Sequence, residues 1–268
     1  MNFRLEVVCI NDDGEQQRGD VLTMERRQLA METLGLNLSE SRVLLERVQD
    51  FVVARQAAED LEQRRGCPSC GERYTSKAGG TIEVKTLFGA VAVANPRWNR
   101  CQCQGSGPKT FRPATSWLRG QTSPELLYLE TKWASLIPFA KVADLLREVL
   151  PVDAANHETV RQHLRATAQR MEEELGEERQ LRLFEGQPED WERQPPPGER
   201  RRQGETISTA FVESTINQVV SRRFVKKQQM QWTLRGAHLR LQTRTKVLNN
   251  ELEEVFRRWY PRFRAQAA

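Results

Sequence analysis

The sequence is poor in apolar residues and has no long apolar run. Apolar types make up 38% of its 268 residues, while 29% are charged. So lean a composition is typical of small modules joined by linkers rather than of one compact globule. No run is long enough to cross a bilayer, and no signal peptide opens the chain. We therefore expect a soluble, cytoplasmic protein without a membrane partner.

A large excess of one charge sign is also missing, since 41 Lys and Arg stand against 36 Asp and Glu. A net charge of +5 decides little about the partner, but its distribution is more informative. Between residues 222 and 264, twelve basic residues stand against three glutamates. This run predicts a concentrated positive field, although a solvated helix face is the plainer interpretation.

Four of the five cysteines fall in two tight pairs, Cys67-Pro-Ser-Cys70 and Cys101-Gln-Cys103. A hairpin predicted over residues 81–94 would bring the pairs together as a tetrahedral cage of four sulfurs suited to structural Zn²⁺. The second pair has one intervening residue and the spacer is long, which departs from the usual zinc ribbon. Four ordinary buried thiols are the alternative, and a disulfide framework does not suit a reducing cytoplasm. Cys9 is interpreted as a small buried apolar residue.

The remaining pattern predicts a mainly α fold with this small β zinc ribbon. A strand is expected from Phe3 to Ile10, followed by helices over residues 24–34 and 39–65. The second helix would carry one apolar stripe, formed by Leu44, Val48, Phe51, Ala54, Ala58 and Leu61. The expected modules are an N-terminal strand and helices (1–65), the ribbon (66–112), DNA-binding helices (123–180), a linker (181–205) and C-terminal basic helices (206–268).

Residues 123–180 have the pattern of a helix-turn-helix. Helices are expected to begin at Ser123-Pro124 and Pro138, and a break at 151–155 precedes the N-cap candidate Asn156. Val142, Leu145, Leu146, Val149 and Leu150 would form the apolar face of the middle helix. The residues predicted to face DNA are His157, Glu158, Arg161, Gln162 and Arg165, of which the last three could read base edges. A plain αα-hairpin with a solvated face fits the pattern equally well. His157 and His163 are interpreted as surface or capping residues rather than metal ligands.

The stretch from Phe211 to Trp232 resembles the C-terminal end of bacterial insertion-sequence transposases of the Kra type. Arg235-Gly-Ala-His-Leu239 and Phe256-Arg-Arg-Trp-Tyr-Pro261 fit the same group, as do the cysteine pairs and the helix pair ending at His163. The resemblance implies a DDE transposase, in which a ribonuclease-H-like domain holds two Mg²⁺ ions with three acids. Glu213 matches the last acid. The interval that should carry the first two acids, between the proline-rich linker and Glu213, is only a few residues long.

The resemblance therefore implies an internally deleted transposase that binds the terminal repeats of a transposon without strand-transfer activity. Mg²⁺ would be bound only if catalysis survives. The residues expected to neutralise DNA phosphates are Arg222, Arg223, Lys226, Lys227, Arg240 and Arg244. Two alternatives stay open. One is an active enzyme that cleaves and joins DNA, and the other is a relic or inhibitor that forms oligomers with itself or with a full-length transposase.

Overall fold

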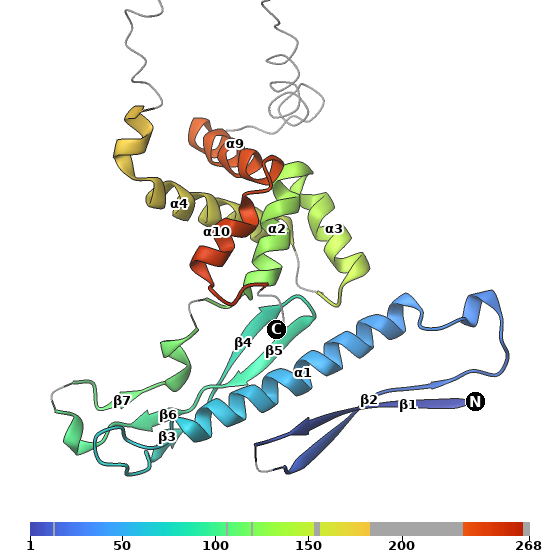
Figure 1. Ribbon diagram of the computed structural model, residues 1–268, viewed down its shortest axis with the longest axis vertical. Coiled ribbons are helices and arrows are strands. Elements are labelled where there is room, and N and C mark those ends of the chain that lie inside the picture. Colours follow the sequence, from blue (N-terminus) through green and yellow to red (C-terminus); the bar gives the residue numbers. More distant parts are fainter. Residues whose placement is uncertain (13, 106, 119, 153–155, 183–232, 265–268) are drawn as a thin grey trace, which may run out of the picture. The chain divides into compact units, whose positions relative to one another are not determined.

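The computed structural model describes residues 1–12, 14–105, 107–118, 120–152, 156–182 and 233–264 (Figure 1). Helices combine with three small antiparallel sheets, so the fold is mixed α/β and contains more strand than predicted. The chain divides into two compact units, which are described separately. One holds residues 1–126 and 144–155, and the other holds residues 127–143 and 156–268. None of the helices in the described ranges is both long and apolar enough to span a membrane.

The first unit begins with a hairpin of β1 (Asn2–Ile10) and β2 (Gln16–Glu25). The predicted strand is confirmed, and Gly14 lies in the turn after it with φ +81°. The helix predicted over residues 24–34 is wrong, because β2 continues to Glu25 and a single 3₁₀ turn, η1 (Met31–Thr33), follows. Pairing with β1 places Met24 opposite Phe3 and overrides the local helical pattern.

Helix α1 (Leu38–Gln63) packs on β2 and on the second hairpin of this unit. It begins after Asn37, which forms a capping box with Glu40, and so starts one residue before the predicted range of 39–65. Phe51 lies against Gly19 so closely that a Cβ there would come within 2.6 Å of its ring. The predicted apolar stripe is only partly correct, because Ala54 and Ala58 are exposed while Leu44, Val48, Phe51 and Leu61 are half-buried.

Two further sheets follow α1. Strands β3 (Ser76–Ala78), β6 (Arg97–Asn99) and β7 (Thr110–Phe111) form one antiparallel sheet, with β6 in the middle. The predicted hairpin is confirmed as β4 (Thr81–Thr86) and β5 (Gly89–Ala94), which pair separately. Alternation along β5 buries Val91 and Val93. The short helices η2 (Gln102–Gln104) and η3 (Pro113–Ser116) complete this part of the chain.

In the remaining described residues, the longer helices are α2 (Pro124–Leu136), α3 (Phe139–Val149), α4 (His157–Arg182), α9 (Leu234–Leu248) and α10 (Leu252–Trp259). The predicted helix starts at Ser123 and Asn156 are confirmed, since each side chain accepts a first-turn N–H, and Thr233 caps α9 in the same way. The predicted face of α3 is half correct, because Leu145 and Val149 are exposed. The core of the second unit comprises Tyr128, Ala168, Met171, Leu239, Val247, Leu252, Val255, Phe256, Trp259 and Phe263.

Two arginines of α9 are buried at the carboxyl end of α2. Arg240 donates to the carbonyl oxygens of Ala134 and Ile137, and its guanidinium lies 4.7 Å from the centre of the Phe139 ring. Arg244 donates to the carbonyl oxygen of Ser135 at 2.8 Å. The last carbonyls of a helix have no partners within the helix and carry a partial negative charge, which a cation stabilises.

The expectation that Arg240 and Arg244 neutralise DNA phosphates is therefore wrong. Their exposed fractions are 0% and 4%, so a phosphate could reach neither guanidinium without opening the core. The sequence places them in a basic run, but the period of α9 turns both inward beside Leu239 and Val247, which are buried. Their positive charge stabilises the free carbonyls at the carboxyl end of α2 and is not available to a nucleic acid.

We predict that Arg240→Ala lowers the free energy of unfolding by about 3 kcal/mol or more, because it leaves buried carbonyls without a donor and creates a cavity. Urea denaturation followed by circular dichroism measures the change. Arg257→Ala is the matched control. Its exposed ion pair with Glu253 predicts a loss below about 1 kcal/mol. If Arg240→Ala left the stability unchanged but weakened DNA binding, the result would contradict this structural role and support phosphate binding by Arg240.

Candidate metal centre

The first cysteine pair lies on a tight turn directly after α1. The N–H of Gly71 donates to the carbonyl of Cys67 at 2.8 Å, and the N–H of Cys67 donates to the carbonyl of Glu72 at 2.9 Å. Gly71 has φ +76°, a left-handed conformation that glycine adopts without strain. This turn carries Cys67 and Cys70 back toward the strands of the ribbon.

The second pair lies where β6 leaves its sheet. The N–H of Gln104 donates to the carbonyl of Cys101 at 3.2 Å, which forms the short helix η2. Gly105, with φ +71°, ends that turn, and the N–H of Arg100 donates to Lys109 as the chain returns to β7. Each pair thus lies on a compact turn at one end of the three-stranded sheet.

The sulfur atoms of the four cysteines lie close together, all within 4.8 Å of one another. The Sγ–Sγ distance is 3.4 Å between Cys67 and Cys103, 3.4 Å between Cys70 and Cys101, and 3.5 Å between Cys70 and Cys103. A tetrahedral site with metal–sulfur bonds of about 2.3 Å requires sulfurs about 3.8 Å apart. The observed spacings bracket that value, so the predicted ligands form a cage that could bind a metal ion such as zinc.

Three aromatic rings support the cage from one side. Tyr74 stacks on Trp98 with ring centres 5.9 Å apart, and Phe111 meets both rings edge-on. With Cys67 they form a small buried cluster, to which Leu61 of α1 adds one side chain. The aromatic packing ties the first cysteine turn to strands β6 and β7.

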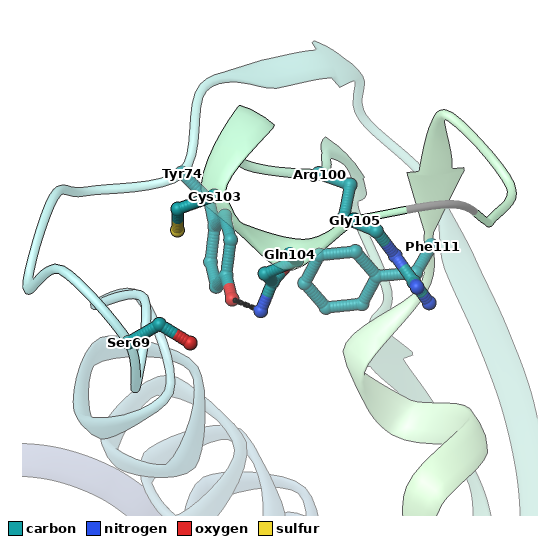
Figure 2. A pocket seen from close by; sticks show the side chains of 7 residues that line it. All are labelled: Ser69, Tyr74, Arg100, Cys103, Gln104, Gly105 and Phe111. Atoms are coloured by element: carbon teal, nitrogen blue, oxygen red, sulfur yellow. Dashed lines mark hydrogen bonds between the residues drawn. The ribbon is translucent and has the colours of Figure 1, made fainter.

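A shallow hollow of about 640 Å³ lies beside the cage (Figure 2). The side chain of Gln104 donates to the hydroxyl of Tyr74 at 2.7 Å, and Cys103 borders the same hollow. Figure 2 shows the Tyr74 and Phe111 rings on either side of Gln104. The hollow is lined by Ser69, Tyr74, Arg100, Cys103, Gln104, Gly105 and Phe111.

The thiols influence one another's ionisation. Burial raises the pKa of the Cys67 thiol, but the backbone N–H groups of Ser69 and Cys70, with the neighbouring thiols of Cys103 and Cys70, outweigh it and lower that pKa to about 6. Hydrogen bonds with the thiols of Cys101, Cys67 and Cys70 raise the pKa of Cys103 far above its ordinary value. Near neutral pH the metal-free cluster therefore holds a thiolate at Cys67 and a protonated thiol at Cys103.

The predicted DNA-facing residues form one exposed polar face at the start of α4. His157, Arg161, Gln162 and Arg165 are exposed, while Val160 and Leu164 are buried on the opposite side. The guanidinium of Arg161 donates two hydrogen bonds to Glu158, and this interaction holds the pKa of the Glu158 carboxyl below its ordinary value. The amide of Gln162 donates to the same carboxylate at 3.0 Å.

His163 has a partner that sequence reasoning missed. Its Nδ1 lies within hydrogen-bond reach of the carboxylate of Glu130 on α2, a side chain that is 2% exposed. The local signal is that Glu130 directly follows the apolar run from Leu126 to Leu129 in α2. The predicted residues Glu213, Arg222, Arg223, Lys226 and Lys227 lie outside the described residues.

We predict that metal binding to the metal-free chain releases fewer than four protons per ion at pH 7, because Cys67 is already ionised there. The number should rise toward four as pH falls below 6, and affinity should fall because protons compete for the thiolates. Calorimetry in buffers of different ionisation enthalpy measures the release, with Cys9→Ser as the unaffected control. Release of four protons at pH 7 would contradict a cluster preformed in the metal-free protein.

Comparison with known proteins does not assign the chain to a family. No protein-family model, no curated protein and no solved structure matches the chain. The site is therefore interpreted from its own residues: four convergent thiols in one unit, and an exposed face of α4 in the other.

Proposed function

We propose that this protein is a transposase-derived DNA-binding protein. It binds duplex DNA through α4, holds a structural zinc ion in its four-cysteine ribbon, and lacks strand-transfer activity. The observation that carries the proposal is the face of α4 on which Arg161, Gln162 and Arg165 are exposed together. Arginine and glutamine supply the paired donors and acceptors that read guanine and adenine in the major groove.

Zinc is the metal that the four sulfurs favour. Four thiolates in a tetrahedron are typical of structural zinc sites, in which every coordination position is filled by the protein. Such an ion has no open position for a substrate, so its role is to stabilise the ribbon. The sheet next to the cysteines, formed by β3, β6 and β7, has strands of only two or three residues, so a metal link between its ends would stabilise it.

Helix α4 is suited to major-groove binding at its amino end. Asn156 caps it, and the exposed face begins within the first turn, where a recognition helix makes its base contacts. Glu158 already orients Arg161 and Gln162 in the free protein. Exposed ion pairs of this kind contribute less than about 1 kcal/mol, so Arg161 can exchange its carboxylate for a base edge or a phosphate.

Of the residues proposed from the sequence to contact phosphates, only those outside the described residues remain in the proposal. Arg222, Arg223, Lys226 and Lys227 keep that proposed role, whereas Arg240 and Arg244 do not. Such contacts would give affinity without sequence preference and a steep dependence on salt. Recognition of transposon terminal repeats would then depend on α4.

The proposed loss of strand transfer rests on the sequence interval before Glu213. One carboxylate cannot hold the two Mg²⁺ ions that strand transfer uses. Among the described residues, the four cysteines are the sole group of three or more Cys, His, Asp or Glu side chains close enough to share an ion. Glu213 lies outside those residues, so the proposal that it lacks the other two acids is drawn from the sequence alone.

We predict one zinc ion per chain in protein purified without chelator, measured by inductively coupled plasma mass spectrometry. Cys67→Ser should abolish the bound zinc and lower the melting temperature, because structural zinc contributes directly to folding. Cys9→Ser is the matched control, since Cys9 lies on β1 away from the cluster and should leave the zinc content unchanged. Zinc retained after Cys67→Ser would contradict the four-sulfur site.

We predict that Arg165→Ala weakens binding to a duplex carrying the terminal repeats of the parent element by about tenfold or more. It should reduce the preference over random duplex. Arg18→Ala, an exposed arginine of β2, is the control and should leave that preference unchanged. Fluorescence anisotropy at several salt concentrations separates base reading from phosphate binding.

Equal affinity for repeat and random duplex would remove specific recognition from the proposal. Mg²⁺-dependent nicking that disappears in Glu213→Ala would instead favour the active enzyme.

A further inference from the structure

The outer edge of β1 is open along its whole length. In the part of the chain that the structure describes, β1 pairs with β2 alone. Met1 and Arg26 exchange both backbone hydrogen bonds at one end of the hairpin, and the N–H of Asn11 donates to Glu15 at the other. Because antiparallel bonding alternates, the odd-numbered residues of β1 bond to β2. The N–H and C=O groups of its even-numbered residues therefore point outward.

Apart from the charges of Arg4 and Glu6, this edge lacks the features that usually prevent strand pairing. It is nine residues long, contains no proline, and is free of the bulge, which falls in β2 instead. Apolar side chains are exposed along it: Phe3 is 45% exposed, Leu5 37% and Ile10 62%. A long, apolar, open edge is a template for another strand.

Helix α1 leaves room above β1. The helix contacts both strands of the hairpin but packs more extensively on β2: Arg47 donates to the carbonyl of Val21, Arg55 bonds to Gln17, and Phe51 lies against Gly19. The apolar face of β1, on the same side of the sheet, is left exposed at Phe3 and Leu5. Another strand could join the edge and share this face without displacing α1.

We propose that β1 pairs with β1 of a second copy of this chain, antiparallel about a two-fold axis at Leu5. The register follows from the charges of the strand. Outward-pointing residues must face outward-pointing residues, so a two-fold axis can pass through residue 4, 5 or 6 near the centre of the strand. An axis at Arg4 or at Glu6 places like charges opposite each other. An axis at Leu5 places Arg4 opposite Glu6 of the second copy, twice.

The charges within each hairpin favour the same register. Glu6 lies directly opposite Asp20 on β2, and these two carboxylates share one neighbouring guanidinium, that of Arg4. The second copy would supply another arginine to this acidic pair. Opposite-charge pairs across neighbouring strands are stabilising, and like-charge pairs are destabilising.

The same axis completes the apolar face. Leu5 would lie opposite Leu5 of the second copy, and Phe3 would lie opposite its Val7. These would be non-hydrogen-bonded pairs, whose side chains approach most closely. The product is a four-stranded antiparallel sheet in the order β2–β1–β1–β2 with one α1 from each copy on the same face. Such an isologous dimer closes both edges of β1 and does not propagate.

The first test measures the mass of the full-length protein by sedimentation across a range of concentrations. The expected result is a monomer–dimer equilibrium. Glu6→Arg should weaken the dimer by about tenfold or more, since it replaces two attractive pairs with two repulsive ones. Arg4→Glu combined with Glu6→Arg should restore it, and it keeps an arginine beside Asp20 within each hairpin. A monomer at all concentrations, or a dimer unchanged by Glu6→Arg, would overturn the proposal.

The second test reports the register directly. Leu5→Cys should form a disulfide between copies under mild oxidation, because the two Cα atoms of this pair lie within disulfide range. Phe3→Cys is the matched control and should cross-link far less, since residue 3 faces residue 7. Peptide mapping by mass spectrometry identifies the bond among the native cysteines. Equal cross-linking by both variants would contradict the axis at Leu5. This dimer does not depend on DNA binding, so either proposal can fail alone.

Discussion

The first unit depends on the convergence of four thiols at a single point. The three-stranded sheet beside the cysteines has strands of only two or three residues and packs on a cluster of three rings, so it has little buried surface of its own to offset the conformational entropy of folding. Cys67 and Cys103 are separated by 36 positions, and a shared ion would close that loop. The N–H of Tyr74 donates to the carbonyl of Arg65 just beyond α1, so the helix is fixed in place by the same cluster.

The second unit depends on a different interaction, in which two buried guanidiniums donate hydrogen bonds to the carbonyls at the carboxyl end of α2. The basic run that suggested a positive surface is largely compensated within the described helices. Arg240 and Arg244 bond to carbonyls of the chain, and several others pair with carboxylates: Lys246 with Glu251, Arg257 and Arg264 with Glu253, Arg235 with Glu172, and Arg258 with Glu174. Net charge along a sequence therefore overstates the field that a helical bundle presents to solvent.

Features encoded by neighbouring residues were predictable, and features made by distant ones were not. The cysteine spacing identified the four thiols that converge, and the caps at Ser123 and Asn156 were recognisable from side-chain type alone. The hairpin β4–β5 followed from alternation bounded by glycines. The extension of β2 and the burial of Arg240 arise from partners far away in the sequence, and the pairing of His163 with Glu130 spans 33 positions. No local pattern records such contacts.

Availability for binding is decided by desolvation rather than by residue type. Arg161 and Arg240 carry the same group and each donates to oxygen, yet one is exposed and the other has no exposed surface. Opening the Arg161–Glu158 pair costs little, because water solvates both ions once they separate. Withdrawing Arg240 would leave helix carbonyls without a donor in the core and would create a cavity, so its free-energy cost is several times larger. A polyanion can compete for the first arginine and not for the second, which is why the DNA-binding role proposed above uses the exposed face of α4 and not Arg240.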